Sequence, residues 1–450
     1  MERSFEEIAP LRFGYGYRRG EEPAIDREAL LTQVPAGAAN PAGFAGGTTP
    51  ERLKALSMMG GGELRRVYGG DAHARVLWSV EQALGFYERL AFFWADHFTV
   101  SRVKRPLRVL VAPHEVEAIR PFIADSFSTL LQQAVLHPAM LMYLNQSRSV
   151  GPNSKRGRKG RRGLNENLAR EILELHTLGV QSDYSQDDVR QFAMLLTGVT
   201  VQRKTGGSTF DPAMSEPGSV RILGKTYAAG AEGFEAITQA LDDLAHHPAT
   251  AKHLAWKLAR HFLSDKPSEE VVQHLAAAYR DNNTQLMPVY RALLEHPAAY
   301  QTFGQKIRQP FDFLVTALRL ALAPDDMAKA VQPTQLQEEE GSMDMEVNPF
   351  PSSLTLQPLT AMGQRPWDSL GPDGWAEEAV AWISPQGLTE RLSFAIRMAK
   401  GPLRRLKVSA MMRQAFGPLA EDRLALLLRE AQGAKEARVL ILMSPEFQRR

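Results

Sequence analysis

Apolar side chains recur every three or four residues along most of the chain, which is the pattern of helices that bury one face. Residues 71–100 predict one long helix or a kinked pair of helices. Residues 114–146 predict three short helices with breaks at Pro121 and Pro138, because proline disfavours helical backbone at the residue before it. Further helices are expected in four stretches: 186–197 behind an N-cap at Ser185, 233–300, from Pro310 onward and from Pro385 onward.

Two stretches interrupt the helical pattern. Residues 199–233 hold short β-branched runs bounded by glycines, which predict a small hairpin or two. Residues 323–376 are first acidic and then rich in proline and glycine, as in a surface loop or linker. We therefore predict a mainly α, multi-helix bundle-like fold with at most a small β-hairpin element. The expected division is an N-terminal extension with the first helices (1–70), a helical core (71–322), a loop-rich linker (323–384) and C-terminal helices packed on the core (385–450).

The composition excludes several kinds of chemistry. The 450 residues include no cysteine, which rules out disulfides, thiolate nucleophiles and cysteine-held metals. A net charge of +2 favours no particular class of partner when it is averaged over the chain. The N-terminus is polar and acidic where a secretory signal needs a basic start and an apolar run, and no transmembrane segment is expected. This predicts a cytoplasmic location and leaves a periplasmic one open.

Polar side chains gather in the run GLNENLAREILELHTLGV at 163–180. On an α-helix, residues three and four apart share a face, so Asn167, Glu171 and Glu174 should form one stripe. Hard oxygen ligands on one rigid element suit a divalent cation or a general acid–base pair. The alternative is an exposed polar face held by the ion pair of Glu166 with Arg170.

The pattern assigns candidate roles to these side chains and to two histidines. Glu171 and Glu174 would serve as general base or metal ligand, and Arg170 would clamp an anion. His97 or His176 would be a second ligand or an acid, which gives His176, Glu171 and Glu174 as the candidate holders of a divalent metal. His97 follows Asp96 at the end of a very apolar helix, where a core histidine bonded to a carbonyl is the alternative.

A basic loop precedes this helix. Residues 155–162 hold six basic side chains, with nearby glycines, and the loop leads into a helix start, so an anionic ligand could be bound there. The alternative is a solvated connector. A nucleic-acid partner is not expected, because no aromatic side chains lie between the charges to stack on bases. The candidate ligand-binding residues are Arg161, Arg162, Asn165, Glu166 and Asn167.

Several motifs together resemble a bacterial family, the domain of unknown function 1800. They are FWADHFTVS, the long run through NENLAREILELHTLGV to YSQDDVRQFAMLLTGVTV, ILGKTY, HPATAKHLAWKLARHF and the closing SPEFQRR, which together cover about 70–450. The resemblance implies a helical fold, and either a partner from domain of unknown function 1501 or a pathway shared with it; proteins of that family are similar to sulfatases and alkaline phosphatases. Many members carry a His-Asp pair before the LGK element, whereas this chain has Asp211 without a histidine.

Two functions follow as hypotheses from the motif and the resemblance. The first is a helical enzyme with a polar, metal-assisted hydrolytic site around the NENLAREILELH helix. The second is a non-catalytic helical binding or scaffold protein that acts with the sulfatase-like partner.

Overall fold

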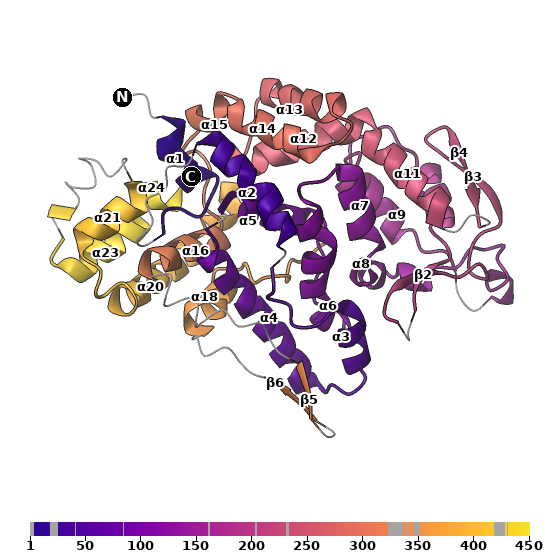
Figure 1. Ribbon diagram of the computed structural model, residues 1–450, viewed down its shortest axis with the longest axis horizontal. Helices are drawn as coiled ribbons and strands as arrows, with labels where there is room; N and C mark the ends of the chain where they lie inside the picture. The colour runs from indigo at the N-terminus through magenta and orange to yellow at the C-terminus, as the bar shows by residue number, and fades with distance from the viewer. Residues whose placement is uncertain are drawn as a thin grey trace.

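Helices form most of the chain in a computed structural model, which confirms the mainly α prediction (Figure 1). Among the described helices, none combines the length and apolarity that crossing a bilayer demands. The structure describes these residues: 4–18, 26–40, 42–83, 85–160, 163–202, 205–230, 234–322, 336–339, 342–345, 352–417, 428–429 and 431–450.

Of the two alternatives for residues 71–100, one long helix or a kinked pair, the structure has the pair. Helix α4 ends at Glu81 because Gln82 takes up extended backbone, and α5 begins at Gly85. The very apolar α5 is buried over most of its length, and it ends at His97. The five helices of this part are α1 (Phe5–Arg12), α2 (Arg27–Ala39), α3 (Thr49–Ala55), α4 (Gly61–Glu81) and α5 (Gly85–His97).

Short helices follow with the predicted proline breaks. Pro121 lies in a single 3-10 turn, and α8 begins at Pro138 after His137 in extended backbone. Ser185 caps α10 through the backbone N–H of Asp188, as expected from the sequence. The elements are α6 (Leu107–Pro113), η1 (His114–Ile119), η2 (Arg120–Phe122), α7 (Phe127–Leu136), α8 (Pro138–Tyr143), η3 (Gln146–Arg148), η4 (Gly157–Lys159), α9 (Asn167–Glu171), η5 (Ile172–His176) and α10 (Gln186–Leu195).

The strands pair as antiparallel two-stranded hairpins. Strand β1 (Val199–Val201) pairs with β2 (Ser208–Phe210), and β3 (Gly218–Ile222) pairs with β4 (Lys225–Ala229), with Ile222 opposite Lys225. Both hairpins lie in the stretch for which a hairpin or two was predicted. A further pair, β5 (Leu336–Glu339) with β6 (Ser342–Met345), lies where the sequence predicted only a loop.

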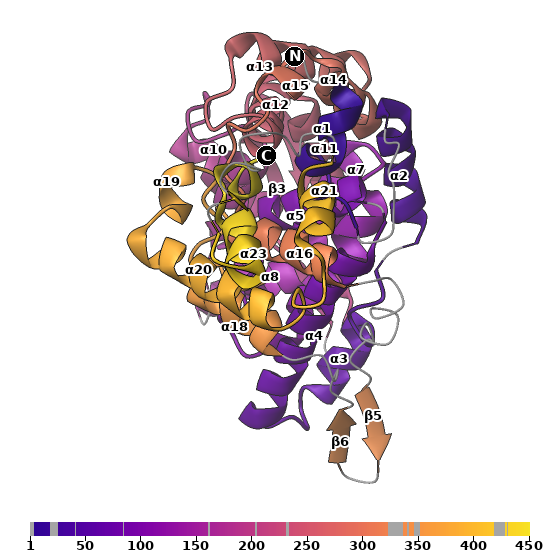
Figure 2. The ribbon, with the colours of Figure 1, turned by 90° about the vertical axis from the view of Figure 1, so that its left-hand side faces the viewer.

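The remaining helices close the fold. Helices α12 and α13 pack along one another, and the C-terminal helices α20 and α21 lie beside α16 (Figure 2). Pro310 opens α16, as predicted. The elements are α11 (Phe234–His246), α12 (Pro248–Phe262), α13 (Glu269–Asp281), α14 (Leu286–Glu295), α15 (Ala298–Gln301), α16 (Pro310–Ala321), η6 (Ser352–Leu354), α18 (Leu356–Ala361), α19 (Ala379–Trp382), α20 (Pro385–Lys400), α21 (Val408–Phe416), α23 (Ala434–Met443) and α24 (Pro445–Gln448).

One large cluster of buried apolar side chains includes residues from α1 to α24. Several charged groups inside the fold form ion-pair networks, which offsets the cost of their desolvation. Arg120 donates to both carboxylate oxygens of Glu88 at 2.8 Å and to Glu115 at 3.0 Å, and Arg75 donates to Glu115 at 2.7 Å. The division of the chain at residues 70, 322 and 384 stays a prediction.

Candidate active site

A cavity of about 590 Å³ lies at the C-terminal end of α5. Its walls come from α5, η5, α12 and the segment 370–382, which precedes α20 and includes α19. The cavity therefore joins elements that lie far apart in the sequence. Its volume falls within the roughly 300–1,000 Å³ that small-molecule sites occupy.

Asp96 faces this cavity from the last turn of α5. Both of its carboxylate oxygens accept from the backbone N–H of Trp375, at 2.9 and 3.1 Å. Gly374 makes this contact possible, because a Cβ there would lie 2.6 and 2.7 Å from the two oxygens and its φ is +82°. Burial, with the negative charge of Glu377, raises the pKa of Asp96 to about 8. Burial thus favours the protonated form of this carboxyl group over the charged one.

Helix α12 presents His253, Lys257 and His261 at intervals of four residues, which places them on one face. His253 donates from Nε2 to the carbonyl of Leu175 at 3.1 Å. His261 contacts the segment 370–382 instead, through Glu377. Lys257 lies between the two histidines and lines the cavity.

The amine of Lys257 has no hydrogen bond or ion pair to any residue that the structure describes. Burial lowers its pKa, and the negative charges of Asp96, Glu377 and Asp373 offset part of that shift. Asp96 and Lys257 thus share one cavity as an acid and an amine whose pKa values are displaced towards each other. Such opposed displacements are typical of acid–base pairs in active sites.

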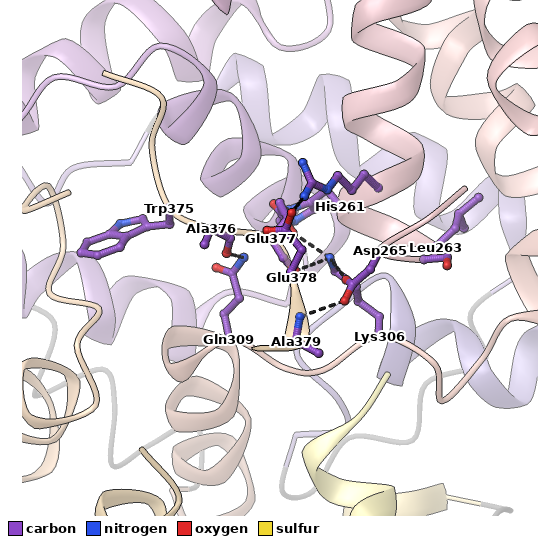
Figure 3. A network of polar contacts seen from close by, with 12 residues as sticks. His261, Leu263, Asp265, Lys306, Gln309, Trp375, Ala376, Glu377, Glu378 and Ala379 are labelled. Carbon is purple, nitrogen blue, oxygen red and sulfur yellow. Dashed lines mark hydrogen bonds and ion pairs between the residues drawn. The ribbon is translucent and has the colours of Figure 1, made fainter. Parts of the chain in front are cut away.

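An ion-pair network holds the segment 370–382 against α12 and the residues before α16 (Figure 3). Glu377 accepts from His261 Nδ1 at 2.6 Å and pairs with Lys306 Nζ at 3.0 Å. Lys306 also donates to Asp265 at 2.7 Å, and Asp265 accepts from the backbone N–H of Ala379 at 2.8 Å. Burial alone would raise the pKa of Glu377, but His261 and Lys306 hold it well below its ordinary value. Glu377 is therefore a fixed negative charge beside Asp96.

The predicted helix of the central motif is α-helical only as far as Glu171. From Ile172 to His176 the chain forms a π-helix, so the expected α-helical face does not continue to Glu174. Arg170 lies about one-third exposed between two carboxylates, Glu166 at 3.4 Å and Glu174 at 3.2 Å. This is the surface ion-pair geometry that the sequence left open as the alternative to a site.

Of the two carboxylates predicted as general bases, one reaches the cavity. Glu174 is one of its lining residues. Burial, with the charge of Glu174, raises the pKa of Glu171 to about 7, although Arg170 opposes the shift. The charge of Asp373 influences both Glu171 and Asp96. The catalytic roles predicted for Glu171, Glu174 and Arg170 remain predictions, and Glu171 keeps a pKa suited to proton transfer.

The two candidate histidines lie together in the interior. Their ring centroids are 5.6 Å apart, and His97 Nε2 donates to the backbone carbonyl of His176 at 3.2 Å. Burial lowers the pKa of His97 well below its ordinary value and that of His176 to about 3, so both rings are neutral. Within the described ranges, no group of three or more His, Asp or Glu side chains is arranged to hold a metal ion. The assignment of a divalent metal to His176, Glu171 and Glu174 gains no support.

Contacts at Asn153 and Arg156 hold the start of the basic loop. Asn153 donates to Glu216 from its backbone at 2.9 Å and from its side chain at 2.5 Å, and Arg156 pairs with Asp211 at 2.6 Å. Asn165 Oδ1 accepts from the backbone N–H of Asn167 at 2.9 Å, so this side chain is used in a local turn before α9. Arg161 and Arg162 lie outside the described residues.

A second cavity, of about 1130 Å³, opens beside this loop. Lys104, Arg148 and Arg156 line it, with Asp211 as its acidic residue. Lys104 Nζ is held by the carbonyls of Met142 and Tyr143 and by Asn145 Oδ1, at 2.6–3.0 Å. Arg148 is exposed, and its positive charge lowers the pKa of Lys104, after the larger effect of burial. This cavity is separate from the one at Asp96.

Sequence reasoning missed Lys257, Asp373 and Glu377, and it considered Asp96 only as the neighbour of His97. The four-residue spacing of His253, Lys257 and His261 in α12 could have indicated a polar helix face. No comparable signal marks Asp373 or Glu377. They lie in a stretch that reads as a loop, and they reach the cavity only through long-range contacts.

The comparison with protein families agrees with the resemblance noted in the sequence. The family model described as "Protein of unknown function (DUF1800)" matches residues 9–449. The match begins closer to the N-terminus than the quoted motifs do, and it spans nearly the whole chain. The chain belongs to this family. Comparisons with curated proteins and with solved structures gave no match.

Proposed function

We propose that this member of the DUF1800 family is an enzyme whose active site is the cavity at the end of α5. Asp96 and Lys257 act in it as a general acid–base pair. The observation that carries the proposal is that both groups face one cavity while Lys257 has no hydrogen bond or ion pair to a described residue. The proposal keeps the enzyme expected from the sequence, with acid–base chemistry by Asp96 and Lys257 in place of metal-assisted hydrolysis.

Each group has a defined task in this site. Asp96, with its pKa raised to about 8, carries a proton at neutral pH and can donate it to a leaving group. Lys257, whose pKa burial lowers, has a larger neutral fraction than an exposed lysine and can accept a proton or attack a substrate. The backbone N–H of Trp375 holds the carboxyl group of Asp96 in place, and Gly374 allows this close approach because it has no Cβ. Glu377, paired with His261 and Lys306, keeps a negative charge nearby that favours the protonated form of Asp96.

Trace labelling with acetic anhydride tests this pair without a known substrate. Only the neutral amine reacts, so the pH at which each lysine gains reactivity reports its pKa. Lys252, on the same helix but 57% exposed and paired with Glu269, is the matched control. We expect Lys257 to gain reactivity at a lower pH than Lys252, because burial favours its neutral amine. Superimposable profiles for the two lysines would contradict the proposal.

The anionic ligand expected from the sequence belongs to the second cavity in this proposal. The exposed guanidinium of Arg148 and that of Arg156 can form charge-assisted hydrogen bonds to an anion. We expect inorganic tripolyphosphate to bind in calorimetry, and the Arg148→Ser, Arg156→Ser double variant to bind about tenfold more weakly. Arg190→Ser, at an exposed position on α10, is the control and should bind as the unchanged chain does. Equal affinities in all three proteins would remove the anion site.

The alternative function remains open to the same labelling experiment. A non-catalytic binding or scaffold protein that acts with a sulfatase-like partner does not require a lysine that becomes reactive at an unusually low pH. An ordinary labelling profile of Lys257 would favour that function over the enzyme. The sulfatase-like partner and the cytoplasmic location stay predictions.

A further inference from the structure

The lining of the Asp96 cavity is acidic. It contains five carboxyl groups, those of Asp96, Glu174, Asp373, Glu377 and Glu378, against the two cations Lys257 and Arg260. Arg260 is not available to a ligand in the same way as Lys257, because it pairs with Glu378 and lies over the ring of Trp256. An anionic substrate would meet repulsion from this lining. Lys257 is therefore poorly placed to serve as an anion clamp.

Aromatic side chains supply much of the remaining wall. Phe93, Trp256, Trp375 and Trp382 line the cavity, and the rings of Trp375 and Trp382 lie 6.1 Å apart. The indole N–H of Trp382 donates to the carbonyl of Ala376 at 2.8 Å, which directs that donor to the protein and not to a ligand. Such walls favour an uncharged substrate with an apolar or planar portion.

Lys257 is the one cation of this lining with no hydrogen bond or ion pair among the described residues. The charged groups that act on it are Asp96 from α5, Asp373 and Glu377 from the segment 370–382, and Arg260 from its own helix. The positive charge of Lys257 in turn lowers the pKa values of His97, His176 and His253. A half-buried amine that no carboxylate holds in place is free to act as a nucleophile once it is neutral.

We propose that Lys257 forms a Schiff base with the carbonyl group of a neutral aldehyde or ketone, and that Asp96 transfers the protons of this reaction. The inference rests on the proposed function and names its substrate class. It is carried by the position of the unpaired amine in an acidic, aromatic-walled cavity beside a carboxyl group.

The reaction balances without an oxidant or a reductant. The neutral amine of Lys257 attacks the carbonyl carbon, a C–N bond forms, and the π electrons move to the oxygen. A proton passes from the nitrogen to the oxygen to give a carbinolamine. Asp96 then protonates the hydroxyl group, water leaves with the C–O electron pair, and the nitrogen lone pair forms the C=N bond. Loss of the nitrogen proton to the Asp96 carboxylate restores the acid, so one carbonyl and one amine give one imine and one water.

Reductive trapping tests the inference on the full-length chain. The protein is incubated near neutral pH with benzaldehyde as the neutral probe and sodium cyanoborohydride, which reduces an imine to a stable amine. Peptide mass mapping then gives the modification rate of each lysine. We expect Lys257 to be modified at least about tenfold faster than the exposed Lys252, in line with its larger neutral fraction.

Asp96→Asn separates the role of the acid from simple access to the amine. The variant keeps an acceptor for the Trp375 N–H but cannot donate an acidic proton, so trapping at Lys257 should slow at least fivefold (roughly 1 kcal/mol) while the circular dichroism spectrum is unchanged. An unchanged trapping rate in this variant would overturn the role of Asp96. Trapping of Lys257 no faster than Lys252 would overturn the Schiff base.

The two proposals can fail separately. If acetic anhydride labels Lys257 at a lowered pH but benzaldehyde does not trap it preferentially, the acid–base pair stands and the carbonyl substrate is wrong. If neither reagent distinguishes Lys257 from Lys252, both proposals are wrong. Lys257→Arg, which keeps the positive charge, should lose trapping at this position and leave the modification of Lys252 unchanged.

Discussion

Lys306→Met is expected to lower the free energy of unfolding by about 3–5 kcal/mol, the largest loss of stability that we expect from a change near the cavity. Lys306 is fully buried, and its amine is shared between Asp265 at 2.7 Å, Glu377 Oε2 at 3.0 Å and the carbonyl of Glu377 at 2.6 Å. Methionine preserves much of the side-chain volume but removes the charge. Glu377 is then buried with His261 as its remaining partner, and the segment 370–382 loses its tie to Asp265 through Lys306.

Lys225→Met is the matched control for this experiment. Lys225 also pairs with an aspartate, Asp243 at 2.5 Å, but its side chain is 49% exposed on strand β4. An exposed pair contributes only about 0–1 kcal/mol. Urea unfolding of both variants, followed by circular dichroism, gives the comparison. If Lys306→Met lost no more stability than Lys225→Met, the network beneath the cavity would not hold the segment in place.

Asp96→Asn is expected to make the chain more stable than its parent at alkaline pH. The folded pKa of Asp96, about 8, lies above the ordinary value of 3.8, so between these values the folded chain holds a proton that the unfolded chain has released. Stability must then fall as pH rises through this window, and the loss is complete above the folded pKa. Asparagine has no charge to bury, so the variant keeps its free energy of unfolding over this pH range.

The expected gain is on the order of 2 kcal/mol near pH 9, because solvent in the cavity screens part of the full effect. The difference between the variant and its parent should shrink steadily towards pH 4. Asp183→Asn changes an exposed aspartate and should show no such pH dependence. Urea unfolding at a series of pH values measures all three proteins. If the Asp96→Asn variant were equally stable or less stable at alkaline pH, burying the charged form of Asp96 would not destabilise the fold, and its pKa would not be raised.

Local signals predicted most of the helical fold. The cap at Ser185 and the prolines at 121, 138 and 310 all act through neighbouring backbone, so they can be read from the sequence. The two hairpins between residues 199 and 229 were predicted for the same reason.

The candidate site could not be predicted from such local signals. Trp375 N–H reaches Asp96 across 279 positions of sequence, and the approach depends on Gly374 having no Cβ. The π-helix from Ile172 to His176 also changes which side chains share a face, and the α-helical spacing assumed for Glu171 and Glu174 does not reveal it. The sequence therefore led to the helix beside the cavity and not to the acid and amine inside it.

The central claim is that Asp96 keeps its proton at neutral pH beside a lysine that shares its cavity. Carbon-13 NMR of the chain labelled at aspartate Cγ measures this directly, with Asp96→Asn to assign the resonance. We predict that Asp96 titrates near pH 8, and that Lys257→Met moves its titration to still higher pH because the positive charge that lowers its pKa is lost. Titration of Asp96 near its ordinary value of 3.8, unaffected by Lys257→Met, would contradict the acid–base pair.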